Sequence, residues 1–187
     1  MKSFAAKSVP KKFPTRENSD SFAIIRAMKT DSEIVEFPSP LGTIRARATA
    51  RGIAELTLLD RASAPAPVAN GNSHLKKLRI ELDRYFDGKL RAFTVPLDPT
   101  GTPFRRRVWE ELTRIPYGET ISYIELARRI GNAKASRAVG GANGANPVCI
   151  LIPCHRVIAA DGTLGGYSAG LSKKQKLLAL EGSGPPR

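Results

Sequence analysis

The sequence has few of the residues that build disulfides or metal centres. Among its 187 residues there are only two cysteines, Cys149 and Cys154, and two histidines, His74 and His155. Two cysteines only five positions apart on one strand are poorly placed to pair, so no disulfide framework is expected, and a reducing compartment follows. These residues also make no convincing four-ligand zinc set, so we expect neither a metal nor a cofactor.

Long apolar runs and acidic residues are scarce as well. No run approaches the roughly 18 residues needed to span a membrane, and the N-terminus has no hydrophobic signal region. Lys and Arg number 30 against 17 Asp and Glu, which gives a net charge of +13. Such an excess favours a polyanionic partner, most simply nucleic acid, although solubility alone is an alternative. With 41% hydrophobic residues, the chain can form one or two small soluble domains.

The most informative stretch covers residues 146–157, around the second cysteine. The apolar run Val148–Ile152 lies between two prolines, which predicts a short buried strand. Cys154 follows the end of this predicted strand, and the adjacent His155 offers a base to a candidate thiol nucleophile. A buried, inert core cysteine is the alternative, and it suits Cys149 better because that residue lies inside the run.

The composition divides the chain into four parts. Residues 1–32 predict a basic, disordered tail with a candidate ordered patch at 22–28, and residues 183–187 predict a second disordered tail. Residues 33–97 predict a small α/β unit that acts as a supporting scaffold and carries no chemistry. Its expected elements are strands at 33–37, 42–49, 53–58 and 93–97, and a helix at 73–87 with Ser73 as its cap.

Residues 98–182 predict a second, mainly helical domain. Thr102 can cap a first helix with Pro103 at its first position, and the sequence Ser122-Tyr123-Ile124-Glu125 is a capping box for a second. A Gly-containing turn leads to a third helix at 134–142, which is the helix-turn-helix pattern of DNA-binding proteins. Small residues dominate this third helix, which fits close approach to a nucleic acid; tight helix packing is the alternative.

The sequence after the second cysteine predicts a glycine-rich segment and a last helix. Residues 161–170 hold four glycines together with Tyr167 and Ser168, and such a segment can form one wall of a substrate pocket or a simple hairpin loop. Ser172 is the expected cap of a last helix that exposes three lysines and is closed by Glu181.

Several motifs, taken together, resemble one family. They include Ile152-Pro153-Cys154-His155-Arg156-Val157, Pro116-Tyr117-Gly118-Glu119-Thr120, Arg137-Ala138-Val139-Gly140, Asn146-Pro147 and Gly166-Tyr167-Ser168. In order and spacing, over about residues 34 to 182, the sequence resembles the O6-alkylguanine-DNA alkyltransferases. The resemblance implies an α+β (mixed α/β) fold, with a small ribonuclease H-like N-terminal α/β domain. A helical, winged helix-turn-helix-like C-terminal domain would follow and contain the active site.

The resemblance also implies a mechanism and residue roles. DNA would be repaired by direct damage reversal, with O6-alkylguanine flipped out of the duplex and its alkyl group transferred irreversibly to Cys154 in one turnover. His155 would deprotonate Cys154 through a bridging water, Glu181 would orient His155, and Tyr123 would protonate guanine N3. The other implied roles are substrate binding by Asn146, Val157, Tyr167 and Ser168, and DNA binding by Ser136, Arg137, Ala138 and Tyr123, with Arg137 taking the place of the flipped nucleotide.

The implied partner is double-stranded DNA carrying O6-alkylguanine, with O4-alkylthymine as a minor substrate. The protein would be a monomer without metal, cofactor or membrane, nucleoid-associated in a prokaryotic cytoplasm or nuclear in a eukaryote. Asn143 and Cys149 occupy positions where members of the family vary, which leaves the tolerance for bulky alkyl groups open. Two rival functions are a non-catalytic binder of alkylated DNA, which would lack the cysteine, and a cysteine hydrolase, which would turn over.

Overall fold

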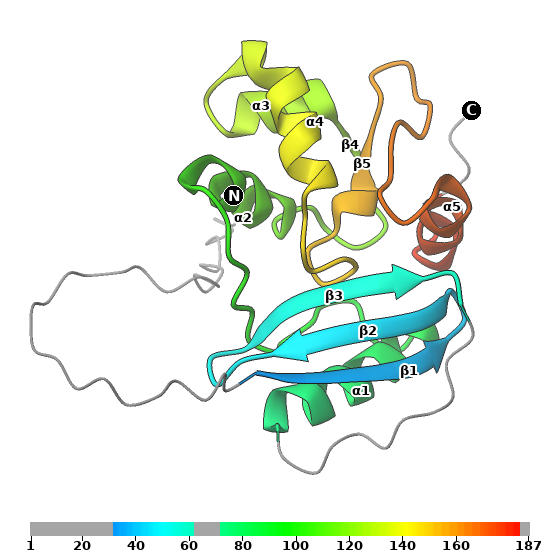
Figure 1. Cartoon of the computed structure of the whole chain (residues 1–187). Helices are drawn as coiled ribbons and strands as arrows, with labels where there is room; N and C mark the ends of the chain where they lie inside the picture. Colours follow the sequence, from blue (N-terminus) through cyan, green and yellow to red (C-terminus); the bar gives the residue numbers. More distant parts are fainter. Residues whose placement is uncertain (1–31, 62–71, 184–187) are drawn as a thin grey trace, which may run out of the picture.

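The computed structural model of the chain describes residues 32–61 and 72–183. The predicted ordered patch at 22–28, nearly all of the predicted N-terminal tail and most of the C-terminal one lie outside these residues. A three-stranded sheet with helix α1 forms one part of the molecule, and the remaining helices gather beyond the β3 edge of this sheet (Figure 1). Sheet and helices in one chain agree with the expected α+β fold class.

The sheet is antiparallel, in the order β1-β2-β3. Its strands are β1 (Glu33–Ser39), β2 (Gly42–Ala48) and β3 (Ile53–Leu59), which confirms the three strands predicted there. Alternate side chains point into the core, where Ile44, Ala46 and Ala48 are fully buried. Helix α1 (Ser73–Phe86) is also confirmed, but its cap is Asn72, whose side chain accepts hydrogen bonds from the first backbone amides.

The predicted strand at 93–97 is wrong. Leu97 makes only an isolated parallel bridge with Ile53, and residues 93–96 are irregular. The buried carboxylate of Glu81 explains this, since it accepts hydrogen bonds from the backbone amides of Thr94 (2.9 Å) and Val95 (3.1 Å). A side chain therefore satisfies amides that a strand would have used for a ladder.

The C-terminal elements carry the helix-turn-helix. Thr102 caps helix α2 (Pro103–Leu112) and Ser122 caps α3 (Tyr123–Arg129), and both side chains accept the expected backbone hydrogen bonds. The indole of Trp109 donates to the Ala142 carbonyl oxygen at 2.8 Å and so ties α2 to α4. The other elements are β4 (Ile121–Ser122), η1 (Ala133–Ala135), α4 (Ser136–Gly144), η2 (Cys154–Arg156), β5 (Val157–Ile158) and α5 (Leu171–Leu180), with β4 and β5 paired in parallel.

The last helix departs from the prediction in two ways. Helix α5 follows Gly170 and has no side-chain cap, so Ser172 does not play the expected part. Its lysines are not all exposed, because Lys173 and Lys174 are buried and only Lys176 faces solvent. Burial is tolerated at Lys174 because its Nζ donates to the carbonyl oxygens of three residues, Val157 (2.6 Å), Leu164 and Gly166.

The predicted buried strand at Val148–Ile152 is also wrong. The segment is a tight turn in which Ile150 has a φ of 70° and the Ile152 amide donates to the Val148 carbonyl oxygen at 3.0 Å. The side chain of Asn146 closes this turn, donating to the Ile152 carbonyl oxygen (2.8 Å) and accepting from the Val148 amide (3.0 Å). The apolar run is buried because the turn docks on strand β3, where Leu56 bonds to Pro147 and Cys149.

Candidate active site and nucleic-acid interface

The turn delivers Cys154 to the first position of η2, directly after Pro153. Cys154 is 1% exposed, and its carbonyl oxygen accepts from the Asn143 side chain at 3.4 Å. A hydrogen bond with the neighbouring Cys149 thiol, together with burial, raises the pKa of Cys154 above that of an ordinary thiol. Cys154 is therefore a neutral thiol at rest, and it needs a base before it can act as a nucleophile.

A buried cluster of charged groups begins at the next residue. The Nε2 atom of His155 lies 3.0 Å from Oε1 of Glu181, which caps the end of α5. Arg156 binds the same carboxylate through two hydrogen bonds of 2.8 Å, from Nε and from Nη2. Burial opposes the charge on Glu181, but the hydrogen bonds from His155 and Arg156 outweigh it and lower the pKa of Glu181 to about 2.

The protonation of His155 follows from this cluster. An ionised carboxylate only accepts hydrogen bonds, so Nε2 of His155 carries the proton and donates it to Glu181. Burial lowers the pKa of His155 in spite of the neighbouring carboxylate, so the ring is neutral near pH 7. Its Nδ1 is buried and has no hydrogen-bond partner among the described residues. Nδ1 can thus accept a proton, although no direct hydrogen bond joins His155 to Cys154 in this part of the chain.

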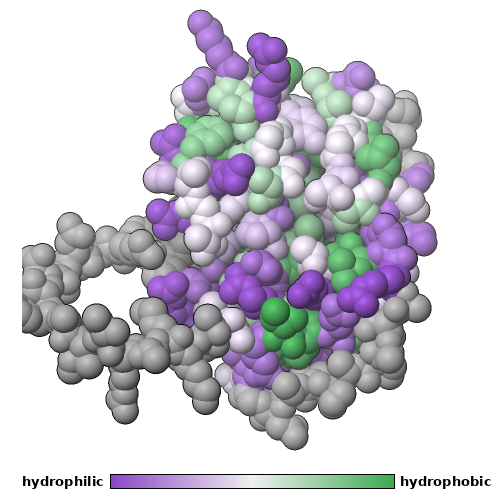
Figure 2. Space-filling view, viewed as in Figure 1, coloured by the Kyte–Doolittle hydropathy of each residue, from purple (hydrophilic) through white to green (hydrophobic). Residues whose placement is uncertain are grey.

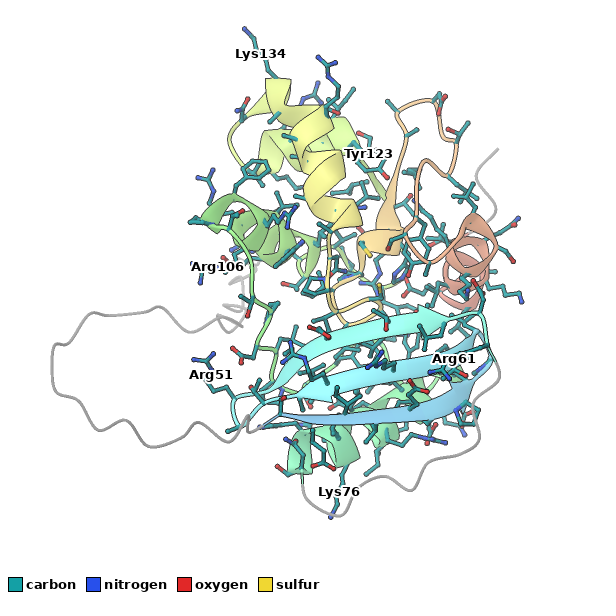
Figure 3. All side chains as sticks on the ribbon, viewed as in Figure 1. Arg51, Arg61, Lys76, Arg106, Tyr123 and Lys134 are labelled. Atoms are coloured by element: carbon teal, nitrogen blue, oxygen red, sulfur yellow. The ribbon has the colours of Figure 1, made fainter. Side chains whose placement is uncertain are left out.

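Tyr123, the first residue of α3, lies close to the segment that follows β5. Its hydroxyl is 3.4 Å from the Gly166 carbonyl oxygen, and its ring is so near Gly165 that an added Cβ there would lie 3.0 Å from it (Figure 3). Burial raises the pKa of Tyr123, so the phenol keeps its proton at neutral pH. On the same segment, the Tyr167 hydroxyl is buried beside the Cys149 thiol, whereas Ser168 is exposed.

Asn146 and Val157, the other two residues predicted to bind substrate, make hydrogen bonds within the protein. Asn146 is buried and closes the active-site turn. Val157 is fully buried in β5, and its carbonyl oxygen accepts from Lys174. The structure thus places Asn146 in the turn that precedes Cys154 and Val157 in the strand that follows it, while their roles toward substrate stay predictions.

Helix α4 packs on α3 and turns its other side outward. Arg137 and Ala138 are exposed and Ser136 is partly exposed, so the residues predicted to contact DNA lie at the start of this helix. A Cβ added at Gly141 would meet no atom of the described residues within 4 Å, and one at Gly140 would make only an ordinary contact of 3.8 Å with Tyr123. The packing of α4 on the described part of the chain therefore does not require its glycines, which weakens the alternative of tight helix packing.

Basic side chains surround this surface. On α2 and around the start of α4, exposed cations without an ion pair to any described residue include Arg105, Arg106, Arg107, Lys134 and Arg137. Arg106 and Lys134 extend away from the body of the protein (Figure 3), and hydrophilic, purple side chains project from the helical end of the molecule as they do from the sheet end (Figure 2). Unpaired cations beside a helix of small residues can bind a phosphate backbone.

Three residues of the site were not predicted from the sequence. Tyr85 donates from α1 to Oε1 of Glu181 at 2.7 Å, although the two residues are 96 positions apart. Arg156 was noticed only as part of a motif, and Lys174 was expected to be exposed. Burial lowers the pKa of Lys174 to about 8. Only the motif around Arg156 gave a signal, since Tyr85 looks like a core aromatic in the sequence.

Within residues 32–61 and 72–183, no group of three or more His, Cys, Asp or Glu side chains is placed to hold a metal ion. No helix in these ranges is both long and apolar enough to cross a membrane.

Comparison with known proteins places the chain in a family. The family described as 6-O-methylguanine DNA methyltransferase matches residues 36–99 through its ribonuclease-like domain and residues 103–183 through its DNA binding domain. The chain belongs to the 6-O-methylguanine DNA methyltransferase family. The family, fold class and methyltransferase activity predicted from the sequence are thereby confirmed.

Individual relatives agree with this family. The methylated-DNA–protein-cysteine methyltransferase of Methanosarcina acetivorans is 44% identical over 150 residues, which cover 79% of this chain and 96% of the relative. The crystal structure of Mycobacterium tuberculosis O6-methylguanine methyltransferase is similar with a TM-score of 0.72 and 40% identity, covering 81% of this chain and 93% of that one. A structure of M. tuberculosis OGT in complex with DNA has the same TM-score, 42% identity and coverage of 82% and 94%.

Proposed function

We propose that Cys154 takes the alkyl group from O6 of alkylguanine in double-stranded DNA and keeps it. The observation that carries this proposal is the position of the Cys154 thiol, next in the chain to a neutral His155 whose Nε2 is held by the ionised Glu181. This is the arrangement of nucleophile, base and orienting carboxylate that activates serine and cysteine in other enzymes.

The proposed step is a displacement at the alkyl carbon. His155 takes the thiol proton through a bridging water, and the sulfur of Cys154 then forms a bond to the carbon. The bond from this carbon to O6 breaks, its electron pair stays with the purine, and Tyr123 gives the purine a proton at N3. The resulting thioether has no group that removes it, so each molecule reacts once.

Access to O6 requires that the base leave the stack, because the duplex hides the reacting atom. We assign this task to the start of α4, where Arg137 is exposed and carries no ion pair with a described residue. Arg137 would fill the gap left by the flipped nucleotide, while Ser136 and Ala138 would contact the neighbouring backbone. The glycines of α4, which the packing of the described residues does not require, support this close approach.

Other parts of the site receive supporting roles. Tyr167 and Ser168 would form the pocket wall, with Ser168 donating to O6. Val157 would pack beneath the base, and Asn146 would join the active-site turn to the helix-turn-helix. O4-alkylthymine would be a minor substrate of the same pocket.

The proposal also covers the domain boundaries, the oligomeric state and the cellular location of the protein. The first domain would end at residue 97 and the second would run over residues 98–182. The protein would act as a monomer, at the nucleoid of a prokaryote or in the nucleus of a eukaryote.

Intact mass tests the proposal directly. After incubation with duplex DNA containing O6-methylguanine, the protein should gain one methyl group at one equivalent, and a peptide map should locate it on Cys154. Methylation on Cys149 would show that the proposal assigns the reaction to the wrong cysteine. Continued turnover beyond one equivalent would favour a cysteine hydrolase. DNA binding without any mass gain would favour a non-catalytic binder of alkylated DNA.

A further inference from the structure

A buried hydrogen bond joins the N-terminal part of the molecule to the candidate active site. The Tyr85 hydroxyl donates to Oε1 of Glu181 at 2.7 Å, across 96 positions of the sequence. Tyr85 is 0% exposed and Glu181 5% exposed, so water does not compete at this contact. Tyr85 belongs to α1, the helix next to the sheet, which otherwise takes no part in the site.

The ring of Tyr85 is fixed by its neighbours. Its centroid lies 5.4 Å from that of Phe86, 5.2 Å from that of Phe93 and 6.1 Å from that of Tyr117. Packed aromatic pairs at such distances hold a ring in one orientation. The direction of the hydroxyl is thus set by packing, and the hydrogen bond does not have to position the ring by itself.

The carboxylate that Tyr85 reaches is fully occupied. Oε1 accepts from Tyr85, from His155 Nε2 at 3.0 Å and from Arg156 Nη2 at 2.8 Å. Oε2 accepts from Arg156 Nε at 2.8 Å and from the Gly118 amide at 3.4 Å. Tyr85 therefore shares one oxygen with His155, and each donor on that oxygen reduces the negative charge that the others meet.

We infer that Tyr85 is a positioning residue of the alkyl transfer, whose hydroxyl limits the charge that Glu181 presents to His155. This inference rests on the proposed function, because it assumes that His155 receives the thiol proton. It adds a residue from the N-terminal part to a site that otherwise comes from the C-terminal part.

The other groups around His155 bear on its ionisation. Five charged or titratable groups face the His155–Glu181 pair. They are Arg156 on η2, Lys174 on α5, Tyr85 on α1, Tyr117 before β4 and the adjacent Cys154. Arg156 and Lys174 oppose a positive charge on His155, and Glu181 favours it. The Tyr85 hydroxyl also opposes a positive charge on His155, because its hydrogen bond to Glu181 reduces the negative charge that the carboxylate presents to the ring.

Removal of the hydroxyl has a definite direction. In Tyr85→Phe, Oε1 loses one donor and presents more charge to His155, so the imidazolium becomes easier to form. The pKa of His155 rises, and a larger fraction of the ring is already protonated at acid pH and unable to take the thiol proton. The acid limb of the rate-against-pH profile should move upward by about 0.5 pH unit, which makes transfer on that limb about threefold slower.

The matched control is Tyr117→Phe. Tyr117 lies beside Tyr85, and its hydroxyl also makes one hydrogen bond, at 2.9 Å, but to the Leu180 carbonyl oxygen instead of a carboxylate. Both variants lose one hydroxyl and one hydrogen bond, and only Tyr85→Phe changes the donors on Glu181. The rate of methyl transfer from O6-methylguanine duplex would be measured against pH for the full chain and both variants.

A second readout uses the scarcity of histidine. The chain has two histidines, so a nuclear magnetic resonance titration can follow His155 with His74 as an internal reference. His74 contacts the Ala50 carbonyl oxygen and not Glu181, so its signal identifies the second histidine in each variant. If Tyr85→Phe does not fold, 3-fluorotyrosine at position 85 keeps the ring and strengthens the donor. It should move the acid limb in the opposite direction.

The outcomes separate the two proposals. An upward shift of the acid limb and of the His155 titration in Tyr85→Phe, with Tyr117→Phe like the unaltered chain, supports the inference. No shift, or the same shift in both variants, overturns it. If the unaltered chain itself carries no methyl group on Cys154 after reaction, the proposed function fails, independently of Tyr85.

Discussion

Substitution of Gly141 by alanine tests what the small residues of α4 are for. Gly141 lies in the helix interior and is exposed, and its φ is not positive. A Cβ built there meets no described atom within 4 Å. Alanine in a helix interior is about 0.5–1 kcal/mol more stable than glycine, so Gly141→Ala should stabilise the protein by about that amount.

The same substitution should weaken DNA binding. Gly141 lies four residues after Arg137, and both are exposed, so they share the face that we assign to DNA. An added methyl group in a close-packed contact costs about 1 kcal/mol or more, which corresponds to about fivefold weaker binding. A variant that is more stable and yet binds DNA less well would be difficult to explain by helix packing within the protein.

Two measurements check this prediction. Urea unfolding gives the free energy of unfolding, and fluorescence anisotropy with a labelled duplex gives the dissociation constant at fixed salt. Gly140→Ala is the control, because its Cβ would face Tyr123 at 3.8 Å on the inner side of the helix. Unchanged DNA affinity in Gly141→Ala would refute the idea that the glycines allow α4 to approach DNA closely. A loss of stability would show that the added methyl group collides with another part of the protein.

Three further predictions concern single residues. Cys154→Ser should fold and bind DNA but take up no methyl group by mass spectrometry, whereas Cys149→Ser should still take up one methyl group on Cys154. Arg137→Ala should slow repair of duplex DNA strongly and the reaction with free O6-benzylguanine little, and equal losses on both substrates would contradict a role in base flipping. Gly101→Ala should destabilise the protein by about 1–3 kcal/mol in urea unfolding, because its Cβ would lie 2.5 Å from the Trp109 ring.

Local patterns predicted much of the fold. The strands at the start of the chain follow from alternation of apolar residues, and the caps Thr102 and Ser122 from short-range hydrogen bonding. These features depend on neighbours in sequence, which is why they can be read without the structure. Cys154 and His155 stood out from the pattern of residues 146–157, whereas the part of Glu181 in the site came from the family resemblance, and the roles of all three are still predictions.

The errors share a physical cause. At Val148–Ile152, the residues are apolar because the segment is buried against β3. The side chain of Asn146 hydrogen-bonds to the Val148 amide and the Ile152 carbonyl oxygen, so the segment forms a turn instead of a strand. Lys174 was expected in solvent because lysine is seldom buried. Its burial is possible because its Nζ donates to three carbonyl oxygens of residues outside α5, which the local pattern does not reveal. Tyr85 shows no pattern of its own, because its partner is 96 positions away.

The docking of the active-site turn on β3 has a consequence for folding kinetics. The Leu56 amide and carbonyl oxygen bond to Pro147 and Cys149, so these contacts close a very long loop of the chain. Contacts of such sequence separation form late, because the entropy of loop closure must be overcome before they contribute. The turn that presents Cys154 should therefore be assembled only near the end of folding, after the sheet exists. A chain that is still folding, or has been cut between its two halves, would hold the cysteine without the geometry that makes it a nucleophile.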